Sequence, residues 1–374
     1  IYYLGPVDGH DVEQLETVIR WAKEMKTTVL VHVLTKKGKG CEYAEKHPDK
    51  YHGVGKFDPA TGALQKSGKC FSDVFGHKLV ELAEKNKDIV AITAAMSSGT
   101  GLNEFADAYH DRFFDVGIAE QHAVSMAAGM AKQGLVPVVA IYSSFLQRAY
   151  DMLIHDVSLL NLHVVFCVDR AGLVGSDGET HHGVFDVDYL CSVPGMQVLC
   201  PSSFAELEQM LDTAINEMDG PVAIRYPRGS EGAYKAISTG GTEVLRHGSD
   251  ITLAAYGTMI NQMLELSEVL AKDGISAEVI KISQIKPLCT DEIVASLKKT
   301  KKLLTAEDVC EHGCIGEALL SAAEEAEIFL EGASICTLGE GIVTHGTVTE
   351  LYKDCGLDTE ALYKKAVTLV RGAK

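Results

Sequence analysis

Apolar runs and amphipathic segments alternate along the middle of the chain. Nearly continuous apolar runs predict buried strands at 89–94, 136–142, 162–168 and 222–226. Apolar residues that repeat at helical intervals predict helices at 74–83, 123–132 and 204–215. Because helices and strands alternate, we expect an α/β fold with a doubly wound parallel sheet, whose ligands bind at the carboxyl ends of the strands.

Similar patterns occupy both ends of the chain. Residues 12–26 are predicted to form a helix, with Asp11 and Gln14 at capping-box spacing, and the apolar run 28–34 predicts a strand buried on both faces. A second α/β pattern starts at residue 251. Its expected elements are strands at 251–256, 277–282 and 302–306 and a helix at 261–273. This last part carries few candidate catalytic groups, so we expect it to have a role in assembly.

Polar, glycine-containing segments divide these patterns into domains. The expected organisation is a partial domain at 1–57, a linker at 58–70, a middle domain at 71–235, a linker at 236–250 and a final domain at 251–374. The first segment is too small to be a whole domain. The chain begins with Ile1-Tyr2-Tyr3-Leu4, which is typical of a strand and contains no initiator methionine, so we expect an N-terminal part to be missing.

The acidic composition limits the classes of partner. A net charge of −18 argues against nucleic acid, whose phosphates would be repelled, and means that an anionic substrate needs a local cluster of Arg or Lys. No apolar run approaches the ~18–20 residues that cross a bilayer, and no signal peptide heads the chain. We therefore expect a cytoplasmic protein with no membrane partner.

The ten cysteines include no C-x-x-C pair, and we expect reduced thiols. The segment Cys310-Glu-His312-Gly-Cys314 has metal-ligating residue types, but no second pair completes it. We therefore expect no metal ligands in this chain.

The stretch 115–122 (DVGIAEQH) places one acid, Glu120, between an apolar strand end and a segment of small residues. One interpretation is a carboxylate that favours the positive end of a helix dipole, which contributes about 0.3–1 kcal/mol. The other is a carboxyl group held against Ile118 and Ala119, which exchanges a proton with a buried base.

Two further segments beyond predicted strand ends carry candidate chemistry. After the strand at 136–142, Tyr142 and Phe145 can stack on a planar heterocycle while Arg148 holds an anion, although a capped helix start with an aromatic core residue is the simpler reading. The glycine-rich stretch 168–183 can bring Asp177 and His181 to a polar substrate, or form a turn with solvated histidines.

Arginines at strand ends can supply the local positive charge. Arg170 follows the strand at 162–168, and Arg228 follows the strand at 222–226. Both could converge on one phosphate. Either Arg225 or Arg228 could instead be an ordinary surface ion-pair partner.

Six segments in order along the chain resemble one family. They are GPVDGHD (5–11), TKKGKG (35–40), DVGIAEQHA (115–123), AIYSSFLQRAYD (140–151), DRAGLVGSDGETHHGVFD (169–186) and YPRG (226–229). Together they resemble 1-deoxy-D-xylulose-5-phosphate synthases, a thiamine-diphosphate enzyme family related to transketolase. The resemblance implies the end of a diphosphate-binding domain at 1–57, then a pyrimidine-binding domain, then a transketolase C-terminal domain.

The resemblance also implies a reaction and its partners. Pyruvate would lose carbon dioxide, and the thiamine-diphosphate carbanion left behind would attack D-glyceraldehyde 3-phosphate. Magnesium would accompany the cofactor, with its ligands in the missing N-terminal part. The family further suggests a homodimer, here possibly completed by a separate N-terminal chain.

Roles follow by matching residues to the family's motifs. Glu120 matches the carboxylate that bonds the aminopyrimidine ring, His10 matches a histidine that faces the thiazolium, and His181 is the third candidate catalytic residue. The other expected cofactor contacts are Phe145, Arg148 and Ile118. The expected substrate contacts are Tyr142, Arg170, Asp177, His181 and Arg228.

Two alternatives remain open at this stage. One is another thiamine-diphosphate enzyme, such as transketolase or a 2-oxoacid dehydrogenase beta subunit. The other is a non-catalytic fragment that keeps the fold without the chemistry. For residues 1–374 alone we expect weak cofactor binding and no turnover.

Overall fold

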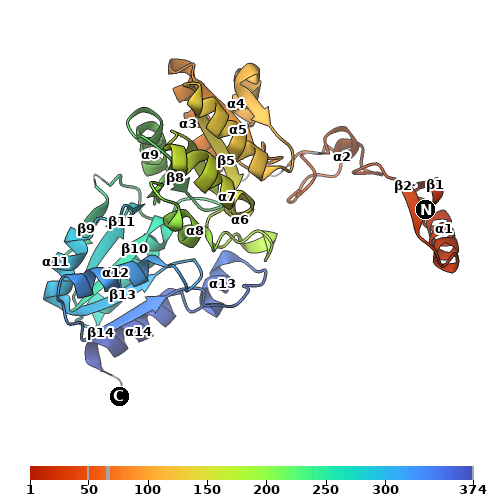
Figure 1. Ribbon diagram of the computed structural model, residues 1–374. Helices are drawn as coiled ribbons and strands as arrows, with labels where there is room; N and C mark the ends of the chain where they lie inside the picture. The colour runs from red at the N-terminus through yellow and green to blue at the C-terminus, as the bar shows by residue number, and fades with distance from the viewer. Residues whose placement is uncertain (49, 65–67, 239, 373–374) are drawn as a thin grey trace. The chain divides into compact units, whose positions relative to one another are not determined.

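The computed structural model describes residues 1–48, 50–64, 68–238 and 240–372, and it divides the chain into two units, residues 1–68 and 69–374 (Figure 1). Each unit has its own sheets. Among the described residues, no helix combines the length and the apolar character needed to cross a membrane.

The first unit contains a two-stranded parallel sheet and two helices. Strand β1 (Tyr2–Asp8) pairs with β2 (Val29–Leu34), and helix α1 (Val12–Glu24) connects them. Asp11 caps α1 by accepting a hydrogen bond from the Gln14 backbone N–H at 3.0 Å. The Gln14 side chain accepts a hydrogen bond from the backbone N–H of Asp8, not of Asp11, so the predicted capping box is only half formed. A short helix, α2 (Glu42–Lys46), follows.

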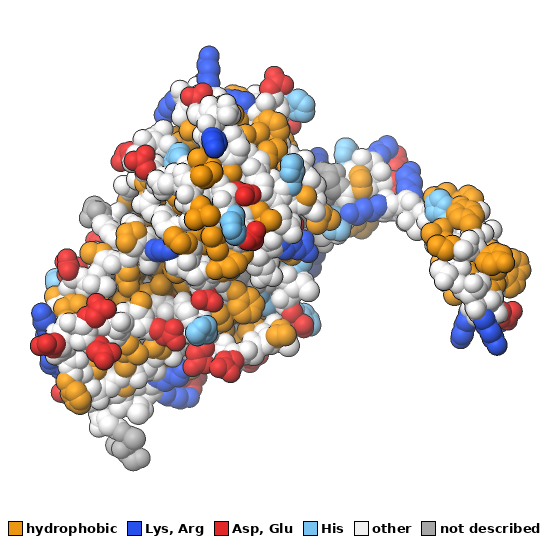
Figure 2. Space-filling view, in the orientation of Figure 1, with side chains coloured by type: hydrophobic (Ala, Val, Ile, Leu, Met, Phe, Trp, Pro, Cys, Tyr) orange, Lys and Arg blue, Asp and Glu red, His pale blue; other side chains and the backbone are white. Residues whose placement is uncertain are grey.

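Apolar side chains of this unit face outward. Along β2, half-buried and exposed residues alternate, so the prediction of a strand buried on both faces is wrong for this chain. No residue of α1 is buried. Orange side chains gather on this part of the chain in Figure 2. The exposed apolar residues of α1 and the strands include Tyr2, Tyr3, Val12, Ile19, Trp21, Leu30 and Leu34.

The second unit contains a seven-stranded sheet with the order β12-β7-β8-β6-β5-β3-β4. All neighbours are parallel except β12, which runs antiparallel to β7. The predicted doubly wound parallel sheet is therefore confirmed. Its strands are β3 (Ile89–Thr93), β4 (Phe113–Asp115), β5 (Val136–Tyr142), β6 (Val165–Asp169), β7 (Gln197–Leu199), β8 (Val222–Arg225) and β12 (Gln284–Lys286).

Helices cover both faces of this sheet, and two clusters of buried apolar residues lie against them. One cluster includes residues of α3 and α9, and the other includes residues of α5 and α8. The helices of this region are α3 (Phe71–Lys85), α4 (Asn103–Ala108), α5 (Glu120–Lys132), α6 (Ser143–Leu146), α7 (Tyr150–Met152), α8 (Asp186–Ser192) and α9 (Phe204–Asn216). Short helical turns are η1 (His110–Arg112), η2 (Gln147–Ala149), η3 (Leu153–Val157), η4 (Ser158–Leu160) and η5 (Gly175–Asp177).

A five-stranded sheet with the order β14-β13-β10-β11-β9 follows in the last part of the chain. Strand β9 is antiparallel to β11, and the other neighbours are parallel. The strands are β9 (Thr242–Arg246), β10 (Ile251–Tyr256), β11 (Ala277–Ile282), β13 (Lys302–Ala306) and β14 (Gly332–Cys336). The helical elements are η6 (Gly257–Met259), α10 (Ile260–Lys272), α11 (Asp291–Thr300), α12 (Ile315–Glu325), α13 (Val348–Asp354) and α14 (Thr359–Arg371). Strand β9 lies inside the segment predicted as a linker.

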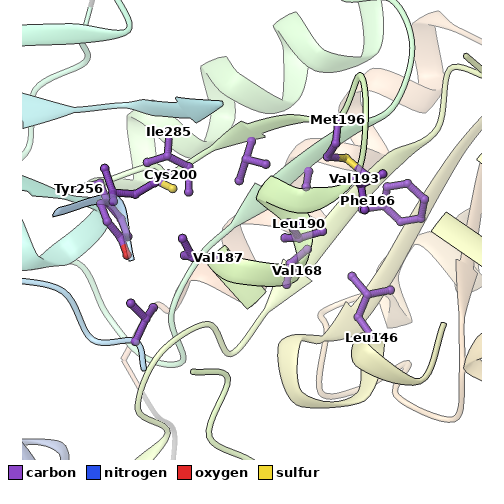
Figure 3. Close-up of a cluster of buried hydrophobic side chains, with 14 of the residues drawn as sticks. Leu146, Phe166, Val168, Val187, Leu190, Val193, Met196, Cys200, Tyr256 and Ile285 are labelled. Carbon is purple, nitrogen blue, oxygen red and sulfur yellow. The ribbon is translucent and has the colours of Figure 1, made fainter. Parts of the chain in front are cut away.

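The two sheets of this unit share a core. Strand β12, which follows β11 in the chain, forms the edge of the seven-stranded sheet. One cluster of buried side chains includes Leu146, Phe166 and Leu190 from the first region together with Tyr256 and Ile285 from the second (Figure 3). The predicted boundary between a middle and a final domain remains a prediction, but the two regions are packed as one unit.

One buried ion pair joins the same two regions, and a second lies within the first of them. Lys281 on β11 is fully buried, and its Nζ lies 2.5 Å from Oε1 of Glu206 on α9. Arg225 at the end of β8 donates to Asp186 on α8 from Nε at 2.9 Å and from Nη2 at 3.2 Å. Arg225 is 5% exposed, so the interpretation of this residue as a surface ion-pair partner is wrong.

The Glu206–Lys281 pair predicts a large loss of stability when one partner is removed. We expect Lys281→Met to lower the free energy of unfolding by about 3–5 kcal/mol, because it leaves the buried Glu206 carboxylate without its counter-charge. Denaturant titration measures the change. Lys364→Met, which breaks an exposed pair with Glu360 on α14, is the matched control and should unfold like the unchanged chain. Equal midpoints for all three proteins would contradict the prediction.

Candidate functional site

The candidate site lies at the carboxyl edge of the seven-stranded sheet. Strand β3 lies between β4 and β5, and the chain visits β4 before it returns to β5 on the other side. The strand order therefore reverses at β3, which is where open α/β sheets bind ligands. Helix α5 starts after β4 and helix α6 starts after β5, and these helices carry Glu120 and Phe145.

Glu120 is the first residue of α5 and is 2% exposed. Nη1 of Arg148 donates to both carboxylate oxygens, at 3.1 and 3.2 Å. The helix begins three residues earlier than predicted, so Glu120 also lies at the positive end of the helix dipole. Ile118 is 80% exposed, and the expectation that Ile118 helps to bury Glu120 is wrong.

Aromatic side chains gather next to this ion pair. The Phe145 ring is stacked on Tyr142, with centroids 5.8 Å apart, and meets His181 edge-on at 5.2 Å. The Arg148 guanidinium lies over the Phe145 ring, 5.5 Å from its centroid. Burial lowers the pKa of His181, while the charge of Asp177 opposes this shift. Burial also raises the pKa of Tyr142.

One carboxylate holds the two predicted arginines. Asp177 in η5 forms an ion pair with Nη1 of Arg170 and another, at 2.9 Å, with Nη1 of Arg228. The Arg170 guanidinium also lies 3.9 Å from the centroid of the Tyr142 ring. Arg170 and Arg228 therefore converge, as the sequence predicts, and Tyr142 links them to the aromatic cluster.

The backbone at this edge adopts unusual conformations. Arg170 follows directly on β6 with φ +59°, a left-handed conformation that costs free energy for a non-glycine residue. Gly99 lies so close to the Tyr142 hydroxyl that a Cβ atom at position 99 would overlap with it. The sharp turn at Arg170 and the absence of a side chain at Gly99 make room for the Tyr142 and Arg170 side chains to stack.

Comparison with known protein families gives three matches along the chain. Residues 1–35 match the profile described as 1-deoxy-D-xylulose-5-phosphate synthase. Residues 69–232 match "Transketolase, pyrimidine binding domain", and residues 240–362 match "Transketolase, C-terminal domain".

Curated relatives match over almost the whole chain. The chain is 48% identical to the 1-deoxy-D-xylulose-5-phosphate synthase of Pelotomaculum thermopropionicum, over 97% of this chain and 58% of that protein. It is 44% identical to the synthase of Clostridium tetani, over 99% of this chain and 60% of that protein. The chain belongs to the 1-deoxy-D-xylulose-5-phosphate synthase family. It thus spans less than two thirds of the length of these synthases.

Solved structures support the same fold for the synthase-family chain. A structure titled "Split gene transketolase, inactive beta4 tetramer" is 29% identical, with a TM-score of 0.72, and covers 81% of this chain and 100% of its own. Transketolase from Campylobacter jejuni, at 16% identity and a TM-score of 0.68, covers 98% of this chain and 67% of its own, and it shows the fold alone.

Ile118 and His10 are the two remaining predicted site residues of this synthase-family chain. Ile118 points outward at the start of α5. His10 belongs to the first unit, where its Nε2 accepts a hydrogen bond from the Lys36 backbone N–H at 2.7 Å. Its role toward the second unit remains a prediction.

Sequence reasoning missed two buried polar residues beside the predicted ones. Asp169, the last residue of β6, is fully buried, and its Oδ2 accepts a hydrogen bond from the Ser72 hydroxyl at 2.7 Å. His182 is 5% exposed, which contradicts the reading of both adjacent histidines as solvated. An acid that directly ends a continuous apolar strand was the available signal for Asp169. No pattern distinguished His182 from His181.

The metal reading of residues 310–314 gains no support. Cys310 Sγ donates to the backbone carbonyl of His312. In the ranges that the structure describes, no three His, Cys, Asp or Glu side chains are grouped so that they could hold a metal ion.

The arrangement in this synthase-family chain has two adjoining parts with different chemistry. A buried carboxylate beside a half-buried aromatic ring can bind a flat heterocycle that offers hydrogen-bonding nitrogens. Two guanidinium groups that share one carboxylate can bind a phosphate dianion. His181 contacts Phe145, and Arg170 contacts Tyr142, so the two parts are continuous.

Asp169 predicts a pH dependence of stability. Burial raises the pKa of Asp169 from its ordinary value of 3.8 to about 7, and the hydrogen bond from Ser72 only partly opposes this rise. Because the pKa is higher in the folded state, the contribution of Asp169 to stability is fully present below about pH 4 and is lost as the pH rises through 7. We expect Asp169→Asn to remove this loss, which is on the order of 2 kcal/mol between pH 5 and 8.

Denaturant unfolding of the second unit at pH 5 and at pH 8 measures this effect. Asparagine keeps an oxygen that can accept the Ser72 hydrogen bond. The control Asp354→Asn, on an exposed residue of α13, should retain the full pH dependence. A pH dependence in Asp169→Asn as steep as in the unchanged chain would refute the assignment.

Proposed function

We propose that this chain carries the pyrimidine-binding and acceptor-binding part of a 1-deoxy-D-xylulose-5-phosphate synthase. The reaction joins pyruvate, with loss of carbon dioxide, to D-glyceraldehyde 3-phosphate, with thiamine diphosphate as cofactor. The observation that carries the proposal is the continuity of the two parts of the site. The buried Glu120 and the Phe145 ring adjoin a pair of arginines suited to a sugar phosphate.

The residues fit the pyrimidine half of the cofactor. Glu120 is a buried carboxylate, and Phe145 is a half-buried aromatic ring that packs against Tyr142. These groups suit a flat ring with nitrogen donors and acceptors. The diphosphate and its magnesium ion need several oxygen ligands. Since the described residues offer no such group of ligands, we propose that these bind to another part of the protein.

Glu120 has the central proton role in this proposal. When bound, thiamine diphosphate supplies the electron sink that accepts the electron pair released by loss of carbon dioxide. The Glu120 carboxyl group would hold a proton in a hydrogen bond with a pyrimidine nitrogen, and the Phe145 ring would pack against that heterocycle. In the structure Nη1 of Arg148 donates hydrogen bonds to both carboxylate oxygens of Glu120. The Arg148 side chain is 49% exposed, so it has room to move away when a ligand binds.

The arginine pair orients the acceptor. Asp177 balances one of the two guanidinium charges, which leaves a net positive site in a chain whose total charge is −18. A phosphate dianion would bind Arg170 and Arg228. His181 and Tyr142 would then face the hydroxyl and carbonyl groups of the sugar. The lowered pKa of His181 favours the neutral imidazole, which can both donate and accept a proton.

A non-catalytic role for the chain by itself is the second candidate. It is supported by the similar split-gene transketolase, whose title describes an inactive tetramer, and by the outward-facing apolar residues of the first unit. Both are consistent with an enzyme completed by a further polypeptide segment. We propose that the complete enzyme is a cytoplasmic homodimer, and these two points remain predictions.

Substitution of Glu120 tests the proposed proton role. We expect Glu120→Ala to lower turnover of pyruvate and D-glyceraldehyde 3-phosphate by about 10²–10⁴-fold, because the pyrimidine nitrogen loses its acid. The assay uses the full-length synthase, with circular dichroism to verify the fold. Glu104→Ala, on the exposed surface of α4, is the control and should keep full turnover. Retained activity in Glu120→Ala would remove this residue from its role.

A polypeptide of residues 1–374 tests the second candidate. With pyruvate, D-glyceraldehyde 3-phosphate, thiamine diphosphate and magnesium, we expect no turnover and only weak cofactor binding. Adding a polypeptide with the preceding part of a family member should restore activity. Full turnover by residues 1–374 alone would overturn this expectation, and failure of complementation in every ratio would favour a chain without catalytic function.

A further inference from the structure

The loop 172–183, which carries Asp177 and His181 and begins two residues after Arg170, is closed at its base. The backbone N–H of Gly172 donates to the carbonyl of Gly183 at 2.7 Å, and the N–H of Gly183 donates to the carbonyl of Gly172 at 2.8 Å. The two hydrogen bonds therefore hold the ends of the loop together. The position of the rest of the loop depends on the residues that contact its inner and outer sides.

His182 lies inside this loop with both ring nitrogens engaged. Nδ1 accepts a hydrogen bond from the Val174 backbone N–H at 3.2 Å, and Nε2 lies 3.1 Å from the backbone carbonyl of Thr344. Because a backbone N–H can only donate and a carbonyl can only accept, these partners imply a neutral imidazole with its proton on Nε2. A buried histidine with both nitrogens satisfied holds its two partners at a fixed separation.

Val174 connects His182 to the arginine pair through its backbone. While its N–H donates to His182, its carbonyl accepts a hydrogen bond from Nη1 of Arg228 at 3.1 Å. The same Arg228 nitrogen contacts Asp177, which also holds Arg170. A continuous hydrogen-bonded path thus connects Thr344 with both arginines.

The last part of the chain packs against the loop at further points. Gly172 lies against the Asp308 carboxylate, so closely that a Cβ atom at position 172 would overlap with it. A Cβ atom at Gly175 would lie 3.1 Å from the carbonyl oxygen of Gly346, and one at Gly178 would lie 3.3 Å from Cβ of His345. The segment 344–346 therefore forms the outer wall of the loop.

We propose that His182 is a positioning residue that fixes the phosphate-binding Arg228 relative to the segment 344–346. This inference rests on the proposed function for the role of Arg228, but the contact itself does not. The transketolase C-terminal domain, for which the sequence predicts only an assembly role, thereby sets the geometry of the acceptor site.

Hydrogen exchange tests the contact independently of any ligand. We expect His182→Phe, which keeps a ring of similar size without its nitrogens, to raise amide exchange at 172–183 by about tenfold, the effect of losing one hydrogen bond of common net strength. His182→Asn keeps an oxygen near the position of Nδ1 and should preserve the protection of Val174. The control His155→Phe, on an exposed residue, should change neither. Unchanged exchange at 172–183, or an equal rise throughout residues 69–372, would overturn the proposal.

Titration with inorganic phosphate tests the connection to Arg228 in the same proteins. We expect His182→Phe to weaken phosphate binding about tenfold and Arg228→Ala to abolish it. If the unchanged chain does not bind phosphate, the proposed acceptor site fails, while hydrogen exchange still decides the contact of His182. If the unchanged chain binds phosphate and His182→Phe binds it equally well, the positioning role is refuted.

Discussion

Asp177 forms ion pairs with both Arg170 and Arg228, and this shared carboxylate allows two like charges to lie side by side at the edge of the sheet. Without it, the guanidinium groups would repel each other in a partly buried site. The pairing fixes the path of the loop after β6, the stacking of Arg170 on Tyr142 and, through Tyr142, the position of the Phe145 ring. The acceptor part and the heterocycle part of the site are therefore held by one charge arrangement.

Several of the longer strands and helices of the second unit could be predicted because their signals are local. Strands β5, β10, β11 and β13 have the bounds that their apolar runs predict. The short edge strands β9 and β12 were missed, because each pairs with a strand distant in sequence and carries no continuous apolar run. Strand β2 of the first unit was predicted to be buried on both faces because its residues are mostly apolar. Burial also depends on the neighbouring strands and helices, which a sequence pattern does not show.

The residues of the candidate site likewise divide into those that the sequence identified and those that it missed. Residues just beyond strand ends were identified because the carboxyl edge of a parallel sheet is a general binding place, and Glu120, Phe145, Arg170 and Arg228 do converge there. Residues that act from inside the protein gave no such signal. His182 is distinguished from His181 only by a three-dimensional contact, with Thr344. Asp169, which contacts Ser72, had only the weaker signal of an acid that ends an apolar strand. The burial of Arg225 depends on Asp186, which lies far away in the chain.

The outward-facing helix α1 gives the chain a useful optical property. Trp21 is the only tryptophan among the 374 residues, and it lies on α1 with 58% of its surface exposed. Indole emission of this protein therefore originates entirely from the first unit. A polypeptide that covers α1 would shift that emission to shorter wavelengths.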